Sequence, residues 1–391
     1  MNWIALLFWI SIFIIFYAFL GYGILLYILV KLKQVFTKKV AKRTDFEPHI
    51  TLIIPCFNEA DIMETKIANC RELDYPVEKL SLVFITDGST DQFAEVLGKH
   101  KDITLLHDER RGGKTAAENR SMQFVKSPFV VFSDANTYLN PEAIRNIVKH
   151  FADDRVGCVS GEKRVMTEKT ESASASGEGI YWKYESLLKK LDSELYSAVG
   201  AAGELVAFRT SLYKDLPEDT LLDDFMQSMQ MAAAGYKIVY EPEAYAAETA
   251  SVNVKEEIKR KIRISAGGWQ SIQRLSGILH FFKTPVLYFQ YISHRVLRWT
   301  VTPFLLILAF LLNIPLATNN DGLYELLMGA QVLFYIAALA GYLLEAKKIR
   351  FKALFVPYYF CVMNYSALAG LKRFLSGIQK GTWEKAQRKT I

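Results

Sequence analysis

Four long stretches without charge dominate the pattern of apolar and polar positions along the chain. Residues 3–30, 299–320, 326–344 and 353–371 contain no Asp, Glu, Lys, Arg or His. A helix of about 20 apolar residues spans the hydrocarbon layer of a bilayer and pairs its own backbone groups. The pattern therefore predicts membrane-spanning helices, with buried helices of a soluble core as the alternative for the last three. The first stretch is too long for a signal peptide and lacks a basic start, which favours an uncleaved anchor.

The residues between the first two stretches follow a different pattern. Short apolar runs typical of strands alternate with helix-like segments, at 50–55, 59–73, 80–86, 91–100, 103–107, 113–126 and 128–134. This alternation predicts an α/β domain with a mostly parallel central sheet, which binds its ligands at the carboxyl ends of the strands. Residues 256–294 pair a basic face with apolar positions at helical spacing, which is typical of helices at a membrane interface.

The distribution of Lys and Arg predicts how the chain is oriented. Basic residues follow the first stretch at Lys31, Lys33, Lys38, Lys39, Lys42 and Arg43. This predicts that the N-terminus lies outside and that residues 44–255 form a cytoplasmic domain of a plasma (inner) membrane protein. Residues 1–43 are then the anchor with its basic flank, and residues 295–391 hold the C-terminal spans and a basic tail. A last stretch that spans the membrane would put this tail outside, whereas a re-entrant or interfacial segment would keep it inside.

Composition adds two exclusions. The net charge of +6 arises largely from clusters beside the apolar stretches, so an anionic membrane surface explains it better than nucleic acid does. The four cysteines, Cys56, Cys70, Cys158 and Cys361, have no zinc-binding spacing and suggest no disulfide framework.

Polar residues follow the predicted strands where a ligand site is expected. Asn58 and Glu59 follow the first strand, Asp87 the second, and Asp134 with Asn136 the fourth. The alternative for each acid is a turn or a helix cap. A P-loop and a Rossmann fingerprint are both absent, so the charge of a bound phosphate would have to be met by a metal ion and basic side chains.

An ordered set of motifs resembles the membrane-bound family 2 glycosyltransferases of GT-A fold, which include cellulose, hyaluronan and poly-N-acetylglucosamine synthases. The set comprises IPCFNE (54–59), TDGSTD (86–91), GGK (112–114), DAN (134–136), GAAG (200–203), the pair Asp223-Asp224 and a basic stretch from Arg260. The resemblance implies inverting transfer of a sugar from a UDP-sugar donor to a growing polysaccharide or glycan.

The resemblance also implies roles for individual residues. Pro55, Phe57, Asn58, Glu59 and Asp87 would line the uridine pocket, and Lys114, with Arg110 as a second basic candidate, would lie near the uridine or diphosphate. Asp134 and Asn136 occupy the family's D-x-D position and would hold Mg²⁺ or Mn²⁺, although an amide replaces the second acid.

The implied catalytic base is Asp224, with Asp223 as its supporting acid; a helix start with two dipole-stabilised acids is a compatible alternative. Gly200–Gly203 matches the acceptor region, or it forms a plain tight turn. Arg263 matches the basic residue of the family's Q-x-x-R-W motif and would lie near the diphosphate, but Ile264 replaces the tryptophan.

Three functional hypotheses follow from these observations. The first is a membrane polysaccharide synthase, and the second is a non-processive enzyme that glycosylates a membrane lipid, which the missing tryptophan and the few spans favour. The third is a catalytically inactive scaffold. Three or four helices leave little room for a polymer pore, so a polymer-exporting enzyme would need a homo-oligomer or an accessory secretion subunit. The other expected partners are membrane lipids, the UDP-sugar donor and a glycan or lipid acceptor.

Overall fold

The computed structural model describes residues 3–37, 46–166, 173–249, 254–318, 322–346 and 351–377. Its one described sheet has eight strands in the order β3-β2-β1-β4-β7-β6-β8-β5. The strands are β1 Ile50–Cys56, β2 Leu80–Asp87, β3 Ile103–Asp108, β4 Phe129–Ser133, β5 Tyr138–Leu139, β6 Val156–Met166, β7 Leu205–Arg209 and β8 Lys237–Thr249. The helices beside this sheet are α3 Ala60–Arg71, α4 Phe93–Leu97, α5 Lys114–Met122, α6 Ala143–Val148 and α8 Asp223–Ala233.

The first half of the sheet confirms the predicted α/β alternation. Strands β3, β2, β1 and β4 are all parallel, and each lies where a short apolar run predicted a strand. The second half differs, because β7 pairs antiparallel with both β4 and β6, and β5 pairs antiparallel with β8. The sheet is therefore mixed.

The sheet is buried on both faces, which explains why β1 is continuously apolar. Alternate residues of β1 face two separate cores: Leu52 and Ile54 pack with α3 and α6, whereas Ile53 packs with α8. Each face of the sheet therefore has its own hydrophobic core.

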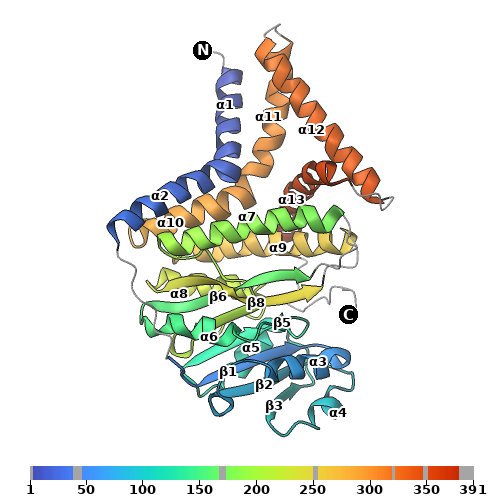
Figure 1. Cartoon of the computed structure of the whole chain (residues 1–391). Helices are drawn as coiled ribbons and strands as arrows, with labels where there is room; N and C mark the ends of the chain where they lie inside the picture. The colour runs from blue at the N-terminus through green and yellow to red at the C-terminus, as the bar shows by residue number, and fades with distance from the viewer. Residues whose placement is uncertain are drawn as a thin grey trace.

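A layer of helices separates the sheet from the apolar helices (Figure 1). Helices α7 Ala173–Leu195 and α9 Val254–Leu275 lie across the sheet, and α1, α11 and α12 extend away from it. The remaining bounds are α1 Trp3–Phe16, α2 Tyr22–Phe36, α10 Pro285–Tyr291, α11 Thr302–Ala317, α12 Gly322–Ala346 and α13 Lys352–Leu375. Segments η1 Tyr17–Gly21 and η5 Ile292–Val301 are π-helical links within the long helices.

Four continuous helices in the described ranges are long and apolar enough to cross a membrane. They cover Trp3–Phe36, Pro285–Ala317, Gly322–Glu345 and Ala353–Leu375. These helices indicate an integral membrane protein. The helix Pro285–Ala317 begins before the uncharged stretch that starts at residue 299, and so includes Arg295 and Arg298. Both of these residues pair with the buried carboxylate of Glu185 on α7, which balances their charge.

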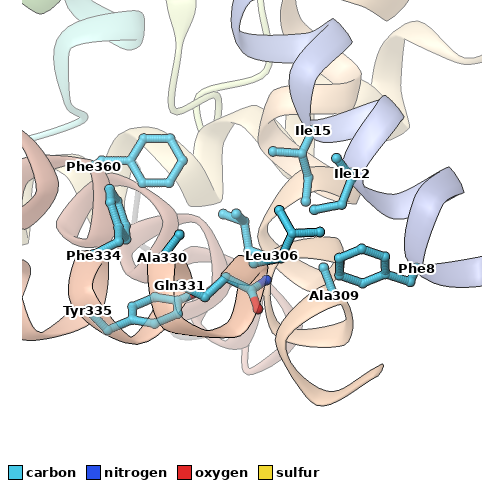
Figure 2. A pocket seen from close by; sticks show the side chains of 11 residues that line it. Phe8, Ile12, Ile15, Leu306, Ala309, Ala330, Gln331, Phe334, Tyr335 and Phe360 are labelled. Atoms are coloured by element: carbon cyan, nitrogen blue, oxygen red, sulfur yellow. The ribbon is translucent and has the colours of Figure 1, made fainter. Parts of the chain in front are cut away.

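A cavity of about 300 Å³ lies among the apolar helices (Figure 2). Phe8, Ile12 and Ile15 of α1 line one side, and α11, α12 and Phe360 of α13 line the rest. Gln331 is the one amide in this lining and accepts a hydrogen bond from Asn313 at 2.9 Å. The cavity is thus apolar and lies within the membrane part of the chain.

Several of the basic residues beside the apolar stretches, on which the orientation depends, lie outside the described residues. These are Lys38, Lys39, Lys42, Arg43, Lys347, Lys348, Arg350 and the tail beyond Gly377. The orientation stays a prediction.

Candidate active site

The carboxylate of Asp87 organises the loop that leads into α5. Asp87 ends β2 and is buried, and its two oxygens accept hydrogen bonds from the backbone N–H groups of Gly112 and Gly113 at 3.0 and 2.7 Å. Gly113 has φ +97°, a conformation that favours glycine, and α5 begins at the next residue, Lys114. Asp87 therefore fixes the direction in which α5 presents its first turn.

The loops after β1 and β2 are tied together. The side-chain oxygen of Asn58 accepts from the Thr90 N–H at 2.8 Å, and the Asn58 N–H donates to Ser89 Oγ at 3.2 Å. Asp91 accepts from the N–H of Ala60 at 2.7 Å and so caps α3 rather than the helix that follows it in sequence. The turn after β2 thus caps a helix that precedes it in sequence, and α4, the helix that follows, has no side-chain cap.

The other predicted pocket residues lie on the same two loops. Pro55 is buried within β1, and Glu59 is buried directly before α3. The ring of Phe57 lies under the guanidinium of Arg111, 3.8 Å from the ring centre. A stacked cation and ring at the edge of these loops form a surface on which a flat nucleobase could lie.

Lys114 joins three acidic residues from three elements. Its Nζ lies 2.9 Å from Asp134 at the end of β4, 3.8 Å from Glu118 on α5 and 3.9 Å from Asp223 on α8. Burial alone would lower the pKa of Lys114, but these carboxylates outweigh burial and raise the pKa well above its usual value. Lys114 is therefore a fixed positive charge at the centre of the site.

Asp223 and Asp224 form the first turn of α8, as the helix-start alternative predicted. Burial, followed by the charge of Asp223, raises the pKa of Asp224 to about 7, against the opposing effect of Lys114. A carboxylate with this pKa can accept a proton near neutral pH. The pair can therefore begin α8 and also present Asp224 as a proton acceptor.

Gly203 brings the loop before β7 against these charges. A Cβ at Gly203 would lie 3.2 Å from Asp224 Oδ2 and 3.3 Å from Lys114 Nζ. The next residue, Glu204, forms an ion pair of 2.7 Å with the buried Lys163 of β6. The small-residue segment thus borders the acidic cluster, and the absence of a side chain at Gly203 keeps the space beside Asp224 open.

The segment that leads into Asp223 is held from two sides. Thr115 and Asn119 of α5 donate to the carbonyl oxygens of Thr220 and Leu216 at 3.2 and 2.8 Å. From α9, Gln270 accepts from the Leu221 N–H at 3.0 Å, and Arg274 pairs with Asp219. Helices α5 and α9 together set the position of the acids on α8.

Two predicted residues lie less centrally. Arg263 lies on α9 one turn before Gly267, which packs against Leu221 and Leu222. Asn136 is half-buried in the turn after Asp134. Within the described ranges, no three His, Cys, Asp or Glu residues are grouped as a metal site, so a cation here would rest on Asp134, Asn136 and ligands from outside the protein.

Sequence reasoning missed Glu118. Its carboxyl is buried and lies 3.8 Å from Lys114 Nζ, in the same cluster. The signal was available, because Glu118 follows Lys114 by four residues, the spacing that places two side chains on one face of a helix.

Residues 51–216 match the family model described as "Glycosyl transferase family 2". This part of the chain, which holds most of the sheet, thus resembles the family 2 glycosyltransferases. Its most similar curated relatives include the poly-beta-1,6-N-acetyl-D-glucosamine synthase of Staphylococcus aureus, 28% identical over 235 residues that cover 58% of this chain and 56% of the relative. The chondroitin synthase of Pasteurella multocida is 28% identical over 116 residues, 29% of this chain and 12% of that protein. The chain thus spans about half the length of the first of these relatives.

A solved structure resembles this chain over almost its whole length. It is a mannosyltransferase from Pyrobaculum calidifontis in complex with GDP-Man and Mn²⁺, with a TM-score of 0.71 at 22% identity, and the match covers 95% of this chain and 99% of that chain. The likeness establishes the GT-A fold with its flanking apolar helices.

Proposed function

We propose that this protein transfers a sugar with inversion from a nucleoside-diphosphate donor, a UDP-sugar by family resemblance, to a growing polysaccharide. The observation that carries the proposal is the convergence of Lys114, Asp134, Asp223 and Asp224 from α5, β4 and α8. A nucleotide-sugar transferase needs a cation near the diphosphate and a carboxylate near the acceptor, and this cluster contains both.

Asp224 is the proposed base. It takes the proton of the acceptor hydroxyl while that oxygen forms a bond to the anomeric carbon. The bond from the anomeric carbon to the diphosphate breaks, and its electron pair leaves with the nucleoside diphosphate. Lys114 lies where it can balance the charge of that leaving group.

Asp134 and Asn136 are the proposed holders of a divalent cation. Mg²⁺ and Mn²⁺ bind through one or two protein oxygens together with substrate phosphates and water, which fits a site with one carboxylate and one amide. Such an ion would act as a Lewis acid on the leaving diphosphate. Arg263 is proposed to assist from α9.

The donor base is proposed to bind between the tied loops after β1 and β2. Phe57, under Arg111, offers a ring for stacking, and Pro55, Asn58 and Glu59 surround it in sequence. Asp87 contributes by holding the Gly112–Gly113 loop, and the remaining lone pairs of its carboxylate can accept from a base N–H.

The polymer product is favoured over a single transfer to a lipid, because two of the curated relatives are named as a poly-beta-1,6-N-acetyl-D-glucosamine synthase and a chondroitin synthase. The protein is proposed to lie in the plasma membrane with its N-terminus outside and its sheet in the cytoplasm, where nucleotide sugars are made. A homo-oligomer or an accessory secretion subunit would complete an exit path.

The proposal is tested by incubating the purified protein with a panel of UDP- and GDP-sugars and Mg²⁺ or Mn²⁺, and sizing the products by mass. We expect one UDP-sugar to give chains longer than a single transferred unit. A single sugar on a lipid would establish the lipid-glycosylating alternative. Turnover no greater than background for every donor would leave the inactive scaffold.

Replacing Gly203 by valine is expected to lower the transfer rate about tenfold or more, because the new side chain would fill the space beside Asp224 and Lys114. Nucleotide binding should change little. The control is Gly277→Val, since a Cβ at Gly277 meets nothing within 4 Å. Transfer at the normal rate by Gly203→Val would show that the acceptor approaches from another side.

A further inference from the structure

A buried lysine lies behind the turn that carries Asp134 and Asn136. Lys66 belongs to α3 and is only 1% exposed. Its Nζ donates to the backbone carbonyl of Thr137 at 2.7 Å and to Ser133 Oγ at 3.1 Å. Burial of a lysine is costly unless its N–H groups are hydrogen-bonded. Lys66 takes no part in the proposed transfer step, so the reason for burying it here lies in what it holds.

The two acceptors of Lys66 stand on either side of the proposed cation ligands. Ser133 directly precedes Asp134, and Thr137 directly follows Asn136. Thr137 also closes the turn itself, since its N–H and its hydroxyl donate to the carbonyl oxygen of Asp134 at 3.3 and 2.8 Å. Lys66 therefore joins the two ends of the turn that presents Asp134 and Asn136.

Asn69, one turn further along α3, holds the segment that follows. Its side-chain N–H donates to the carbonyl of Leu139, and its side-chain oxygen accepts from the Leu139 N–H, both at 2.8 Å. Lys66 and Asn69 are three residues apart, so they lie on the same face of α3. One helix face thus fixes the chain on both sides of Asn136.

Helix α3 approaches this turn from the face of the sheet opposite to the charged cluster. Met63 of α3 belongs to one core, whereas Ala117 of α5 and Phe225 of α8 belong to the other. On that second face, Lys114 lies 2.9 Å from the carboxylate of Asp134. The backbone around Asp134 is therefore held from α3 and its side chain from α5. Lys66 can position the turn without occupying the space of the donor.

We infer that Lys66, together with Asn69, is a positioning residue that clamps this turn from behind and so sets how tightly Asp134 and Asn136 bind their cation. The inference deepens the proposed function and rests on it wherever a cation or sugar transfer is the readout. An ion held by few protein oxygens depends on the exact position of each one. Residues behind metal ligands typically contribute about 10- to 100-fold to metal affinity or activity.

Lys66→Met separates positioning from charge. Methionine keeps an unbranched side chain of similar length and removes every N–H donor. Loss of a positive charge near a cation would by itself strengthen cation binding, whereas loss of the clamp would weaken it. We expect Lys66→Met to raise the Mn²⁺ concentration at half-saturation about tenfold in the presence of UDP, measured by electron paramagnetic resonance of free Mn²⁺. Unchanged or tighter Mn²⁺ binding would overturn the inference.

Hydrogen exchange measures the clamp without cation or substrate. The backbone N–H groups of residues 134–139 should exchange about fivefold faster or more in Lys66→Met than in wild-type protein, with those of β2 unchanged. The matched control is Thr51→Val, which removes a buried hydroxyl that pairs with Ser127 Oγ before β4, far from the turn. This control should leave both measurements unchanged. Equal exchange at residues 134–139 in Lys66→Met and wild-type protein contradicts the clamp.

Failure of the inference and failure of the proposed function are distinguishable. If wild-type protein binds no Mn²⁺ with UDP, the proposed cation site fails, and the exchange rates still decide whether Lys66 clamps the turn. If Lys66→Met does not fold, Lys66→Gln replaces it, because its side chain is shorter but keeps an N–H donor. We expect Lys66→Gln to weaken Mn²⁺ binding about threefold or more, and unchanged binding in that variant would also refute the inference.

Discussion

Replacing Asp224 by asparagine is expected to lower the rate of sugar transfer about 10²- to 10⁴-fold, because an amide cannot take the proton of the acceptor hydroxyl. Nucleotide binding should persist, because Asp224 lies on α8. The loops proposed to hold the nucleobase of the donor follow β1 and β2 instead. Single-turnover transfer and nucleotide binding by calorimetry measure the two effects separately. Asp154→Asn is the matched control, because the side chain of Asp154 is fully exposed. Normal transfer by Asp224→Asn would remove Asp224 from the role of base.

The raised pKa of Asp224 gives the same prediction a pH dependence. Since the base must be ionised, the wild-type rate should rise with pH up to about 7 and then level off. The free energy of unfolding should fall as the pH rises over the same range. The folded-state pKa lies above the unfolded value, so ionised Asp224 destabilises the fold progressively from about pH 4 to pH 7. Asp224→Asn should therefore raise Tm at pH 8 and have little effect on Tm near pH 4.

Replacing Asp134 by asparagine is expected to lower transfer about 100-fold or more, because the proposed cation would lose its one charged protein ligand. The nearest contact of Lys114, at 2.9 Å, would also lose its charge. The measurement is the transfer rate as a function of Mn²⁺ and Mg²⁺ concentration. Saturating metal should not restore the wild-type rate.

The matched variant for this experiment is Asn136→Asp, which restores a second carboxylate two residues from Asp134. We expect it to reach half-maximal rate at a lower metal concentration than wild-type protein. If removal of divalent ions leaves the wild-type rate unchanged, or if neither variant alters the metal dependence, Asp134 and Asn136 do not hold a cation.

The sequence predicted the parallel half of the sheet because its signals are local. An apolar run such as Ile50–Cys56 needs cover on both faces, and the segments before and after β2 are too polar for strands. The second half of the sheet, which contains the antiparallel strands β7 and β5, has no such signal. Strand β7 lies between β4 and β6, and its position depends on partners far away in sequence. Phe129 pairs with Arg209, 80 residues later, and Ser160 pairs with Val206, 46 residues later.

The sequence by itself determined the α/β class, the apolar helices and the acids at the strand ends, since strand ends, helix starts and uncharged runs are properties of neighbouring residues. The tertiary structure alone decided that Asp87 binds the Gly112–Gly113 backbone and that Asp91 caps α3. It also decided that Glu118 and Asp223 both lie beside Lys114, and that Arg295 in an apolar helix pairs with Glu185. These contacts link residues distant in sequence, and their strength depends on burial and on the charges that folding brings near, which no local pattern records.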